Sequence, residues 1–109
     1  MLEPILGSES SERVLIFILA REQGYAREIA RLFNTKLYSI QKQLDKLERG
    51  GVLVSQTAGR TRLYTFNPRY PFLKELKGLL SKALAYYPEV DQETLLMNRR
   101  RPRRRGKPQ

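Results

Sequence analysis

The segment 36–49 places polar side chains that can form hydrogen bonds on one side of an expected helix. These polar residues are Lys36, Tyr38, Ser39, Gln41 and Lys42. The apolar residues of the same segment recur at steps of three and four, and they are Leu37, Ile40, Leu44 and Leu47. In a helix with 3.6 residues per turn, Tyr38 and Lys42 then lie nearly opposite the apolar side, and Gln41 lies near the boundary, half buried. The pattern is typical of a helix that packs through its back and presents its front to a nucleic-acid groove.

These residue types suit contact with nucleic acid. Glutamine can bond an adenine edge in two places, lysine can meet guanine or phosphate, and tyrosine and serine commonly reach phosphates. The first two turns contain no arginine, so we expect no bidentate selection of guanine by this helix. Farther along, Lys46 and Arg49 are interrupted by Asp45 and Glu48. An ordinary solvated face is the alternative for all of these residues, and it is the favoured one for Lys46 and Arg49.

The composition removes most catalytic and metal-binding chemistry. The sequence has no cysteine and no histidine, which excludes disulfides, thiolate nucleophiles, imidazole bases and the usual zinc sites. It also lacks a paired-carboxylate spacing and a Gly-rich phosphate loop of the G-x-x-x-x-G-K type. We therefore expect neither an enzyme nor a protein with a cofactor or a metal.

Positive charge is concentrated near residue 100. The chain has 21 Lys and Arg against 11 Asp and Glu, a net charge of +10 that favours a polyanionic partner. Residues 99–109 hold seven basic residues and no acidic one, which leaves a net charge of +3 for residues 1–98. The arginines expected to make nonspecific phosphate contacts are Arg99, Arg100, Arg101, Arg103, Arg104 and Arg105. A tail that only increases solubility is the alternative.

A chain of 109 residues with 40% hydrophobic content supports one modest core. We expect a single domain over residues 1–88, ended by Pro88, and a flexible tail over 89–109 that is acidic first and then basic. A weak extra turn or helix within 89–98, which is apolar at 95–97, is the alternative for the first part of the tail. The longest apolar run, 14–20, has seven residues, whereas a membrane-spanning helix needs about 20. No basic segment precedes it as in a signal peptide. We expect no membrane partner and a soluble protein of the prokaryotic cytoplasm, associated with the nucleoid.

The first elements follow from the serine cluster and the apolar run. Residues 1–8 form an extended lead-in, because Pro4 and Gly7 disfavour a regular helix. The candidate caps of the first helix are Ser8, Ser10 and Ser11. The centre of this helix, 14–20, is apolar on every side, so its outer side must also be covered, either within the chain or by a second subunit.

The next elements are two helices and a hairpin. A short helix over 25–33 and the helix at 36–49 are joined by a polar turn, in which Thr35 is the expected cap. The glycine pair at 50–51 ends the second helix. The strands expected after it are 52–57 and 60–67, joined by a turn at Ala58 and Gly59. The predicted fold class is mainly α with a small β-hairpin (α+β), in the element order of a winged helix-turn-helix.

Residues 12–68 resemble the winged helix-turn-helix of bacterial and archaeal ArsR-like and MarR-like transcriptional regulators. The segments that carry the resemblance are REIARLFNTKLYSIQKQLDKLERGGVL and the wing, GRTRLYTFNP. They are also similar to the winged-helix domains next to minimal nucleotidyltransferases, whose Gly-Ser and paired-aspartate signature is missing after residue 68. No transferase activity is therefore implied.

The resemblance implies a sequence-specific transcriptional regulator that binds double-stranded DNA. In such proteins the second helix of the motif, 36–49 here, enters the major groove, and the wing, 52–67 here, reaches the adjacent backbone or minor groove. The residues at matching positions are Lys36, Tyr38, Ser39, Gln41 and Lys42 on the helix, with Arg60 and Arg62 on the wing. Because Arg60 and Arg62 are two apart, they can share one face of the hairpin.

The last expected helix, 72–87, favours a homodimer. Its apolar residues are Phe72, Leu73, Leu76, Leu79, Leu80, Ala83, Leu84 and Tyr87. So broad an apolar surface needs two neighbours, which we expect to be the first helix and the same helix of a partner. We therefore expect a homodimer formed through the first helix and helix 72–87. A terminal helix that only closes the core of its own monomer is the structural alternative. The functional alternative is a winged-helix module for protein assembly or RNA binding that has no operator.

Overall fold

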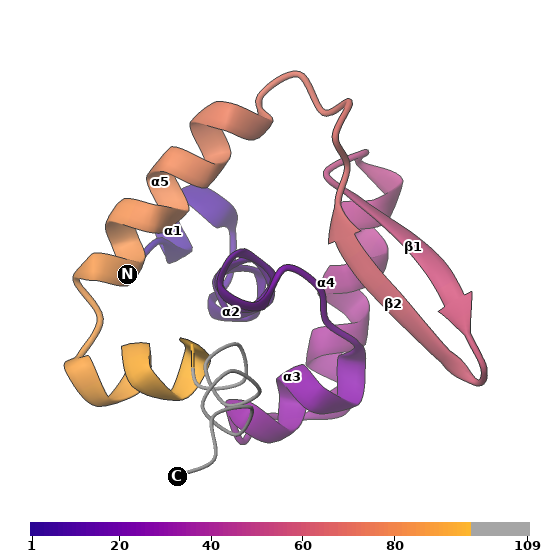
Figure 1. The fold of residues 1–109 in the computed structure, drawn as a ribbon, viewed down its shortest axis with the longest axis horizontal. Helices are drawn as coiled ribbons and strands as arrows, with labels where there is room; N and C mark the ends of the chain where they lie inside the picture. Colours follow the sequence, from indigo (N-terminus) through magenta and orange to yellow (C-terminus); the bar gives the residue numbers. More distant parts are fainter. Residues whose placement is uncertain (97–109) are drawn as a thin grey trace, which may run out of the picture.

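The computed structural model describes residues 1–96, and residues 97–109 lie outside the described part. Its elements, shown in Figure 1, are α1 (Glu3–Leu6), α2 (Glu9–Arg21), α3 (Ala26–Leu32), α4 (Leu37–Arg49), β1 (Leu53–Ala58), β2 (Thr61–Phe66) and α5 (Leu73–Ala85). A further helical segment covers 89–96. The predicted class, mainly α with one antiparallel hairpin, is confirmed. None of the helices in residues 1–96 combines the length and the apolar character needed to cross a membrane.

Helix α2 runs through the middle of the molecule, and the other helices are arranged around it (Figure 1). Ser8 is its cap, because the Ser8 side chain accepts a hydrogen bond from the Ser11 N–H at 3.0 Å. Residues 14–18 are at most 1% exposed. They are covered by α1, α3, α4, α5 and β2 of the same chain. Burial within one chain is therefore the alternative that the structure supports for the apolar centre of α2.

Helices α3 and α4 are joined by a tight turn. Asn34 has a φ of 52° in this turn, a left-handed conformation that asparagine tolerates better than most residues. The Thr35 N–H donates to the Ala30 carbonyl at 3.0 Å and so closes the end of α3. The prediction that Thr35 caps α4 is wrong, because the capping position is Lys36 and no side chain forms a cap bond there.

The back of α4 is held by apolar packing and by one polar contact. Ile40 and Leu44 are 0% and 1% exposed, and the predicted apolar side of the helix is confirmed. The Ser11 hydroxyl of α2 donates to the Gln43 side-chain oxygen at 2.9 Å. Gly51 then takes a φ of 81°, which ends the helix and turns the chain into β1. These contacts on the buried side of α4 fix the direction in which its exposed side points.

The hairpin pairs its strands from Leu53 opposite Phe66 to Ala58 opposite Thr61. Its turn residues are Gly59 and Arg60, one position later than predicted. Gly59 adopts a φ of 65°, a conformation that favours glycine in two-residue hairpin loops.

A backbone bridge ties this hairpin to the chain that enters α3. The Gly24 N–H donates to the Tyr64 carbonyl at 3.1 Å, and the Tyr64 N–H donates to the Gly24 carbonyl at 2.8 Å. A Cβ atom on Gly24 would lie 2.8 Å from ring atoms of Phe17, so only glycine fits here without a shift of the core. The bridge therefore fixes the position of the hairpin relative to α3.

Helix forms at both ends of the described chain, within the lead-in expected to be extended and at 89–96, where a short extra helix was the alternative to a flexible tail. Residues 1–8 are not simply extended, because α1 forms with Pro4 in its first turn, where the missing proline N–H costs no helical bond. Residues 89–96 are helical, and Leu95 is 1% exposed in the core. The Arg21 guanidinium donates to the carbonyls of Leu95 and Thr94, each at 2.9 Å. The chain therefore does not leave the packed structure at Pro88.

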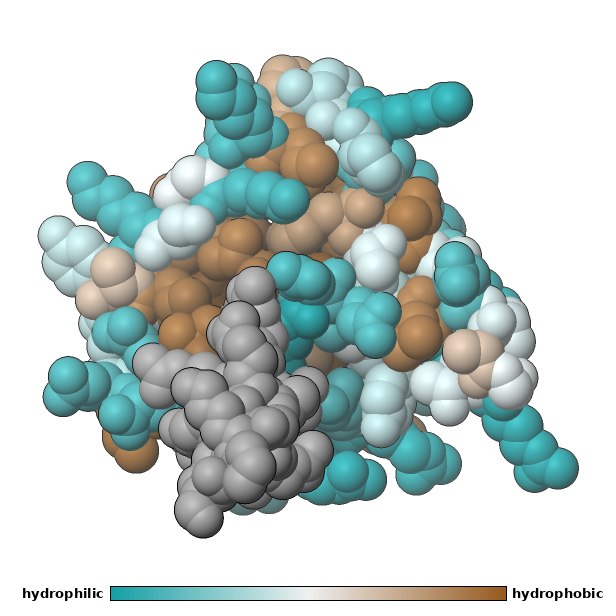
Figure 2. Space-filling model, in the orientation of Figure 1, coloured by the Kyte–Doolittle hydropathy of each residue, from teal (hydrophilic) through white to brown (hydrophobic). Residues whose placement is uncertain are grey.

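Helix α5 packs on α2 and keeps some of its apolar surface outside the core. Leu80 and Ala83 are buried. On the face shown in Figure 2, apolar surface gathers between α5 and α2. Phe72 and Tyr86 are 62% and 71% exposed, and half-buried Leu79 lies midway between them in the sequence. A spacing of seven residues puts these three on one side of a helix, and we call them the aromatic stripe.

Candidate nucleic-acid interface

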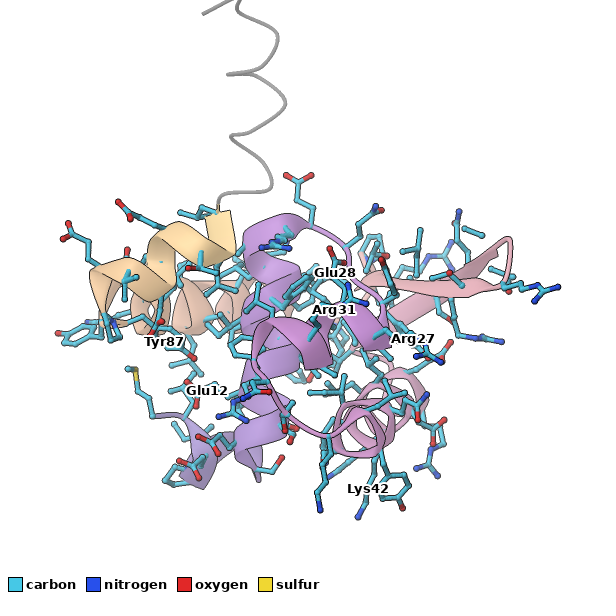
Figure 3. The ribbon with its side chains drawn as sticks, turned by 90° about the horizontal axis from the view of Figure 1, so that it is seen from below. Glu12, Arg27, Glu28, Arg31, Lys42 and Tyr87 are labelled. Atoms are coloured by element: carbon cyan, nitrogen blue, oxygen red, sulfur yellow. The ribbon has the colours of Figure 1, made fainter. Side chains whose placement is uncertain are left out.

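The front of α4 presents most of the predicted polar residues to solvent. Tyr38 is 71% exposed, and Lys36 and Lys42 are exposed as well. Figure 3 shows Lys42 projecting outward from the edge of the molecule. Ser39 is half buried. The expectation that Gln41 is half buried is wrong, because Gln41 is exposed and lines an open groove beside the hairpin.

The acidic residues of α4 are engaged with neighbours. The carboxylate of Asp45 lies 3.2 Å from the Arg49 guanidinium, one helical turn away. Glu48 accepts a hydrogen bond of 2.6 Å from the Ser55 hydroxyl of β1. Arg49 is therefore offset by Asp45, and the negative charge of Glu48 is directed toward the hairpin. The second half of α4 has two acidic and two basic residues, so it adds little net charge to the exposed side of the helix.

A groove of about 310 Å³ separates α4 from the hairpin and from the start of α3. Arg60 and Arg62 both line it, so the predicted wing arginines do share one side of the hairpin. The Arg62 guanidinium donates to the Ser55 hydroxyl at 3.1 Å, which links it to the Glu48 contact. Burial raises the pKa of Tyr64 in the same groove, with a further contribution from Glu48, so its hydroxyl stays protonated.

Arg27 of α3 also lines this groove, and the sequence did not single it out. In Figure 3, Arg27 lies on the side of α3 nearest the hairpin. Sequence position alone gives no reason to group it with Arg60 and Arg62. These three arginines are brought together by the Gly24–Tyr64 bridge, a backbone contact between residues 40 positions apart in the sequence. We call the space lined by Arg27, Arg60, Arg62 and Gln41 the arginine groove.

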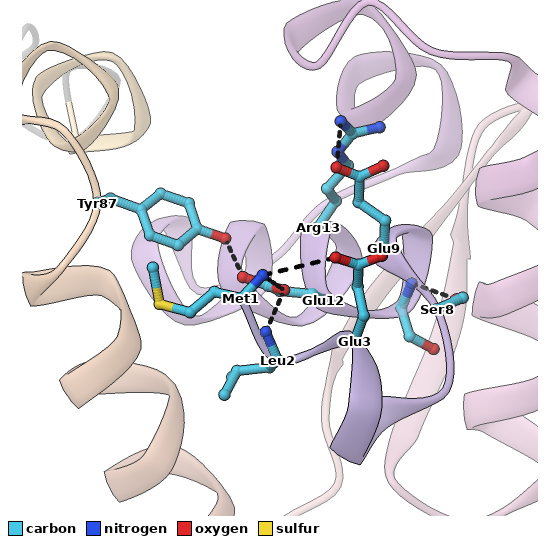
Figure 4. A network of polar contacts seen from close by, with 9 residues as sticks. Met1, Leu2, Glu3, Ser8, Glu9, Glu12, Arg13 and Tyr87 are labelled. Carbon is cyan, nitrogen blue, oxygen red and sulfur yellow. Dashed lines mark hydrogen bonds and ion pairs between the residues drawn. The ribbon is translucent and has the colours of Figure 1, made fainter.

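A second cavity, of about 420 Å³, lies at the start of α2, away from the arginine groove. Its lining includes Glu12, Arg13, Phe33, Tyr87 and Asp91. Figure 4 shows the polar contacts beside it. The Glu12 carboxylate accepts from the Tyr87 hydroxyl at 2.6 Å, from the Leu2 N–H at 2.7 Å and from the Met1 amino group at 3.2 Å. These contacts join the start of α2 to the end of α5.

Some predicted contacts fall outside the described residues. The tail arginines, from Arg99 to Arg105, are among residues 97–109 and have no structural account. Within residues 1–96, no group of three or more Asp and Glu side chains is placed to hold a metal ion. The described site consists of the front of α4 and the arginine groove.

Comparison with known proteins gives matches in structure alone. No protein-family model matches the sequence, and no curated protein matches it. A probable transcriptional regulator from Pseudomonas aeruginosa matches with a TM-score of 0.59 and 20% identity, over 92% of this chain and 83% of that chain. A double mutant of Lactococcus lactis ZitR, in its apo form, matches with a TM-score of 0.54 and 18% identity, over 91% of this chain and 83% of that chain.

A third match is the homodimeric winged helix-turn-helix DNA-binding domain of Mb0332 from Mycobacterium bovis, a possible ArsR-family regulator. Its TM-score is 0.52 at 20% identity, over 72% of this chain and 71% of that chain. The fold is that of winged helix-turn-helix transcriptional regulators. The predicted resemblance to winged helix-turn-helix regulators of this kind is confirmed at the level of structure. In this winged helix, α3 and α4 form the helix-turn-helix, and β1 and β2 form the wing.

Proposed function

We propose that this winged helix is a sequence-specific DNA-binding transcriptional regulator. Helix α4 enters the major groove, and the wing contacts the adjacent backbone or minor groove. The residues that meet DNA are Lys36, Tyr38, Ser39, Gln41 and Lys42 on α4, with Arg60 and Arg62 on the wing. The basic tail adds affinity that does not depend on sequence.

The observation that carries this proposal is the contrast between the two sides of α4. Tyr38 is 71% exposed, whereas Ile40 and Leu44 on the back are at most 1% exposed. A large aromatic ring has little packing reason to point into solvent beside Lys42. A protruding helix with a tyrosine and two lysines at its front matches what is needed to reach phosphates and base edges.

The charges around this helix favour a polyanionic partner such as DNA. A negative charge on the front of α4 would repel phosphate, and Asp45 and Glu48 are the acidic residues of that helix. Asp45 is paired with Arg49, and Glu48 is bonded to Ser55. Lys36 and Lys42 are exposed in the first half of the helix, which has no acidic residue in its first turn.

A homodimer would let two copies address two half-sites. The aromatic stripe on α5 is an exposed apolar surface of the kind that marks protein contacts. Most of α2 is already covered within the chain, so we assign the dimer contact mainly to α5 rather than equally to the first helix. In a two-fold dimer the α4 helices would lie about one DNA turn, roughly 34 Å, apart.

The alternative is a winged-helix module for protein assembly or RNA binding that has no operator. The aromatic stripe favours this alternative as much as it favours a dimer, because either partner would cover it. The two functions differ in whether the front of α4 selects a DNA sequence.

Gel-shift measurements on duplexes selected from a random library test the proposal. We expect Tyr38→Ala and Lys42→Ala each to weaken binding to the selected duplex by about tenfold, the effect of losing a contact worth about 1.4 kcal/mol. Lys74→Ala on the exposed side of α5 is the control, and it should bind like the parent. Failure to enrich any sequence, or equal binding by all three variants, would count against the proposal and favour the assembly module.

A further inference from the structure

The arginine groove brings together positive charge from two separate parts of the chain. Arg27 comes from α3, and Arg60 and Arg62 come from the turn and the second strand of the wing. All three side chains are exposed. Gln41 lines the groove from α4, and Tyr25 lines it from the segment before α3. The groove is therefore open to solvent, has a volume of about 310 Å³ and presents three guanidinium groups.

The position of these groups relative to one another is set by the backbone. The Gly24–Tyr64 bridge makes two backbone hydrogen bonds, of 3.1 and 2.8 Å, between the segment before α3 and β2. Gly24 itself is buried against the Phe17 ring and has no room for a side chain. The wing is thereby held next to α3 at Tyr64, two residues from Arg62.

Two acidic residues close to the groove are engaged with other side chains. Glu28 follows Arg27 in α3, and its carboxylate lies 3.4 Å from the Arg21 guanidinium. Glu48 accepts from the Ser55 hydroxyl, which also accepts from the Arg62 guanidinium. Glu48 therefore acts on the groove only through Ser55 and by its contribution, after that of burial, to the raised pKa of Tyr64. Among the described residues that line the groove, none is an aspartate or a glutamate. The positive charge of the groove is therefore not neutralised by a carboxylate from residues 1–96 in its wall.

We infer that the arginine groove binds one phosphate of a nucleic-acid backbone, with Arg27 as a contact residue together with Arg60 and Arg62. Guanidinium groups bind phosphate oxygens through paired hydrogen bonds, and Gln41 and the Tyr25 hydroxyl can donate to the same anion. The inference rests on the proposed function, and it adds α3 to the binding surface. It also gives the wing arginines a role beside α4 rather than at a distant part of the duplex.

The test compares Arg27→Ala with Arg31→Ala in the full chain. Arg31 is exposed on the same helix one turn later, and it does not line the groove, so its loss removes the same charge without removing the contact. We expect Arg27→Ala to lower affinity for selected and random duplexes alike by about five- to tenfold. The slope of log K against log salt should become shallower, by at most about 0.9, the value for one complete phosphate contact on B-DNA, because Arg60 and Arg62 still face the same phosphate. Arg31→Ala should change affinity less than about twofold and leave the slope unchanged.

A charge-conserving variant and a DNA-free measurement complete the test. Arg27→Lys keeps the charge but loses the paired geometry, and it should bind between the parent and Arg27→Ala. Titration of the free protein with inorganic phosphate should shift the NMR signals of the Arg27, Arg60 and Arg62 side chains. The shifts at Arg60 and Arg62 should be lost in Arg27→Ala.

The outcomes separate this inference from the proposed function. If the parent binds duplexes and Arg27→Ala behaves like Arg31→Ala, the groove contact is wrong and the function stands. If the parent binds no duplex, the function is wrong, and the phosphate titration alone decides whether the groove holds an anion. Phosphate shifts at the groove without an effect of Arg27→Ala on DNA would assign the site to a small phosphorylated ligand and overturn the backbone contact.

Discussion

Glu12 is a carboxylate with 3% exposure at the start of α2, and three donors surround it. Burial alone would raise the pKa of Glu12, but the hydrogen bonds from the Tyr87 hydroxyl, the Leu2 N–H and the Met1 amino group outweigh it and lower that pKa. Burial raises the pKa of Tyr87, and its bond to Glu12 raises it further. The pair is therefore most stable with Glu12 charged and Tyr87 neutral.

The charge on Glu12 should make the stability of the fold depend on pH in the acid range. Because the folded pKa of Glu12 lies below its usual value of 4.5, the stability that Glu12 contributes is present above about pH 4.5 and is lost as the pH falls through the lower, folded value. Glu12→Gln should lower the free energy of unfolding at pH 7 by about 1–3 kcal/mol. Urea titrations from pH 7 to pH 3 should show the difference between parent and variant shrinking in acid.

Tyr87→Phe is the matched variant at the other end of the same bond. The pKa of Tyr87 is raised above its usual value of 10.0, so its contribution is present below pH 10 and is lost as the pH rises beyond that. The free energy of unfolding of Tyr87→Phe should therefore fall less than that of the parent as the pH is raised above 10.

The expected role of Glu12 has its own contradicting outcome. A Glu12→Gln variant with the same pH dependence of stability as the parent would show that this carboxylate is not the one that titrates.

Residue spacing predicts burial within one helix but not contacts between separate elements. The spacing of Ile40 and Leu44 was enough to predict their burial, because a helix fixes its own periodicity. Gln41 was misplaced, since its exposure depends on how far the hairpin lies from α4. Arg27 was missed for the same reason, as its neighbours come from β2 and the hairpin turn.

At the scale of elements, the helical segment 89–96 is held by Arg21 and Leu95. The Arg21 guanidinium donates to two carbonyls of this segment, lies 3.4 Å from Glu28 and stacks 4.8 Å from the centre of the Phe17 ring. Leu95 fills a place in the core. One arginine on α2 thus connects the segment after α5 to α3 of the helix-turn-helix.

This arrangement predicts where the tail can be removed. A chain that ends after residue 96 keeps Leu95 and the carbonyls that Arg21 binds, so it should unfold at the same urea concentration as the parent. A chain that ends after Pro88 loses the buried Leu95 and should be less stable by about 2–5 kcal/mol, as for a buried leucine cut to alanine. Leu95→Ala in the full chain is the control that separates packing from tail charge. Equal stability of the two shortened chains would contradict the role of Leu95.

Across the whole molecule, the exposed basic residues near the wing and the exposed apolar residues of α5 lie on different sides. The front of α4 and the arginine groove carry exposed basic residues beside the wing. The aromatic stripe lies on α5, which packs on the opposite part of α2 (Figure 1). A dimer formed through α5 would therefore leave both α4 helices accessible.

Tyr86→Glu tests this dimer without touching the core. Placing a charge in an apolar interface should raise the dimer dissociation constant by about 30-fold or more, the effect of losing about 2 kcal/mol at a central contact. Ser81→Glu adds the same charge at an exposed position on the outer side of α5 and should leave association unchanged. Sedimentation velocity over a range of concentrations measures both. A parent that stays monomeric, or equal association of the two variants, would rule out the aromatic stripe as the interface.

Local patterns were sufficient to predict the order of helices and strands, the buried side of α4 and the class of fold, because these depend on periodicity and on glycines within a few residues. The composition, which has no cysteine and no histidine, also excluded catalysis and metal binding by those two residue types. The tertiary structure decided which residues meet across the chain, such as Arg27 with Arg62, Glu12 with Tyr87, and Arg21 with Leu95. These contacts arise when separate elements pack around α2. The arginine groove exists because the backbone bridge at Gly24 brings the wing to α3, and no local pattern encodes that distance.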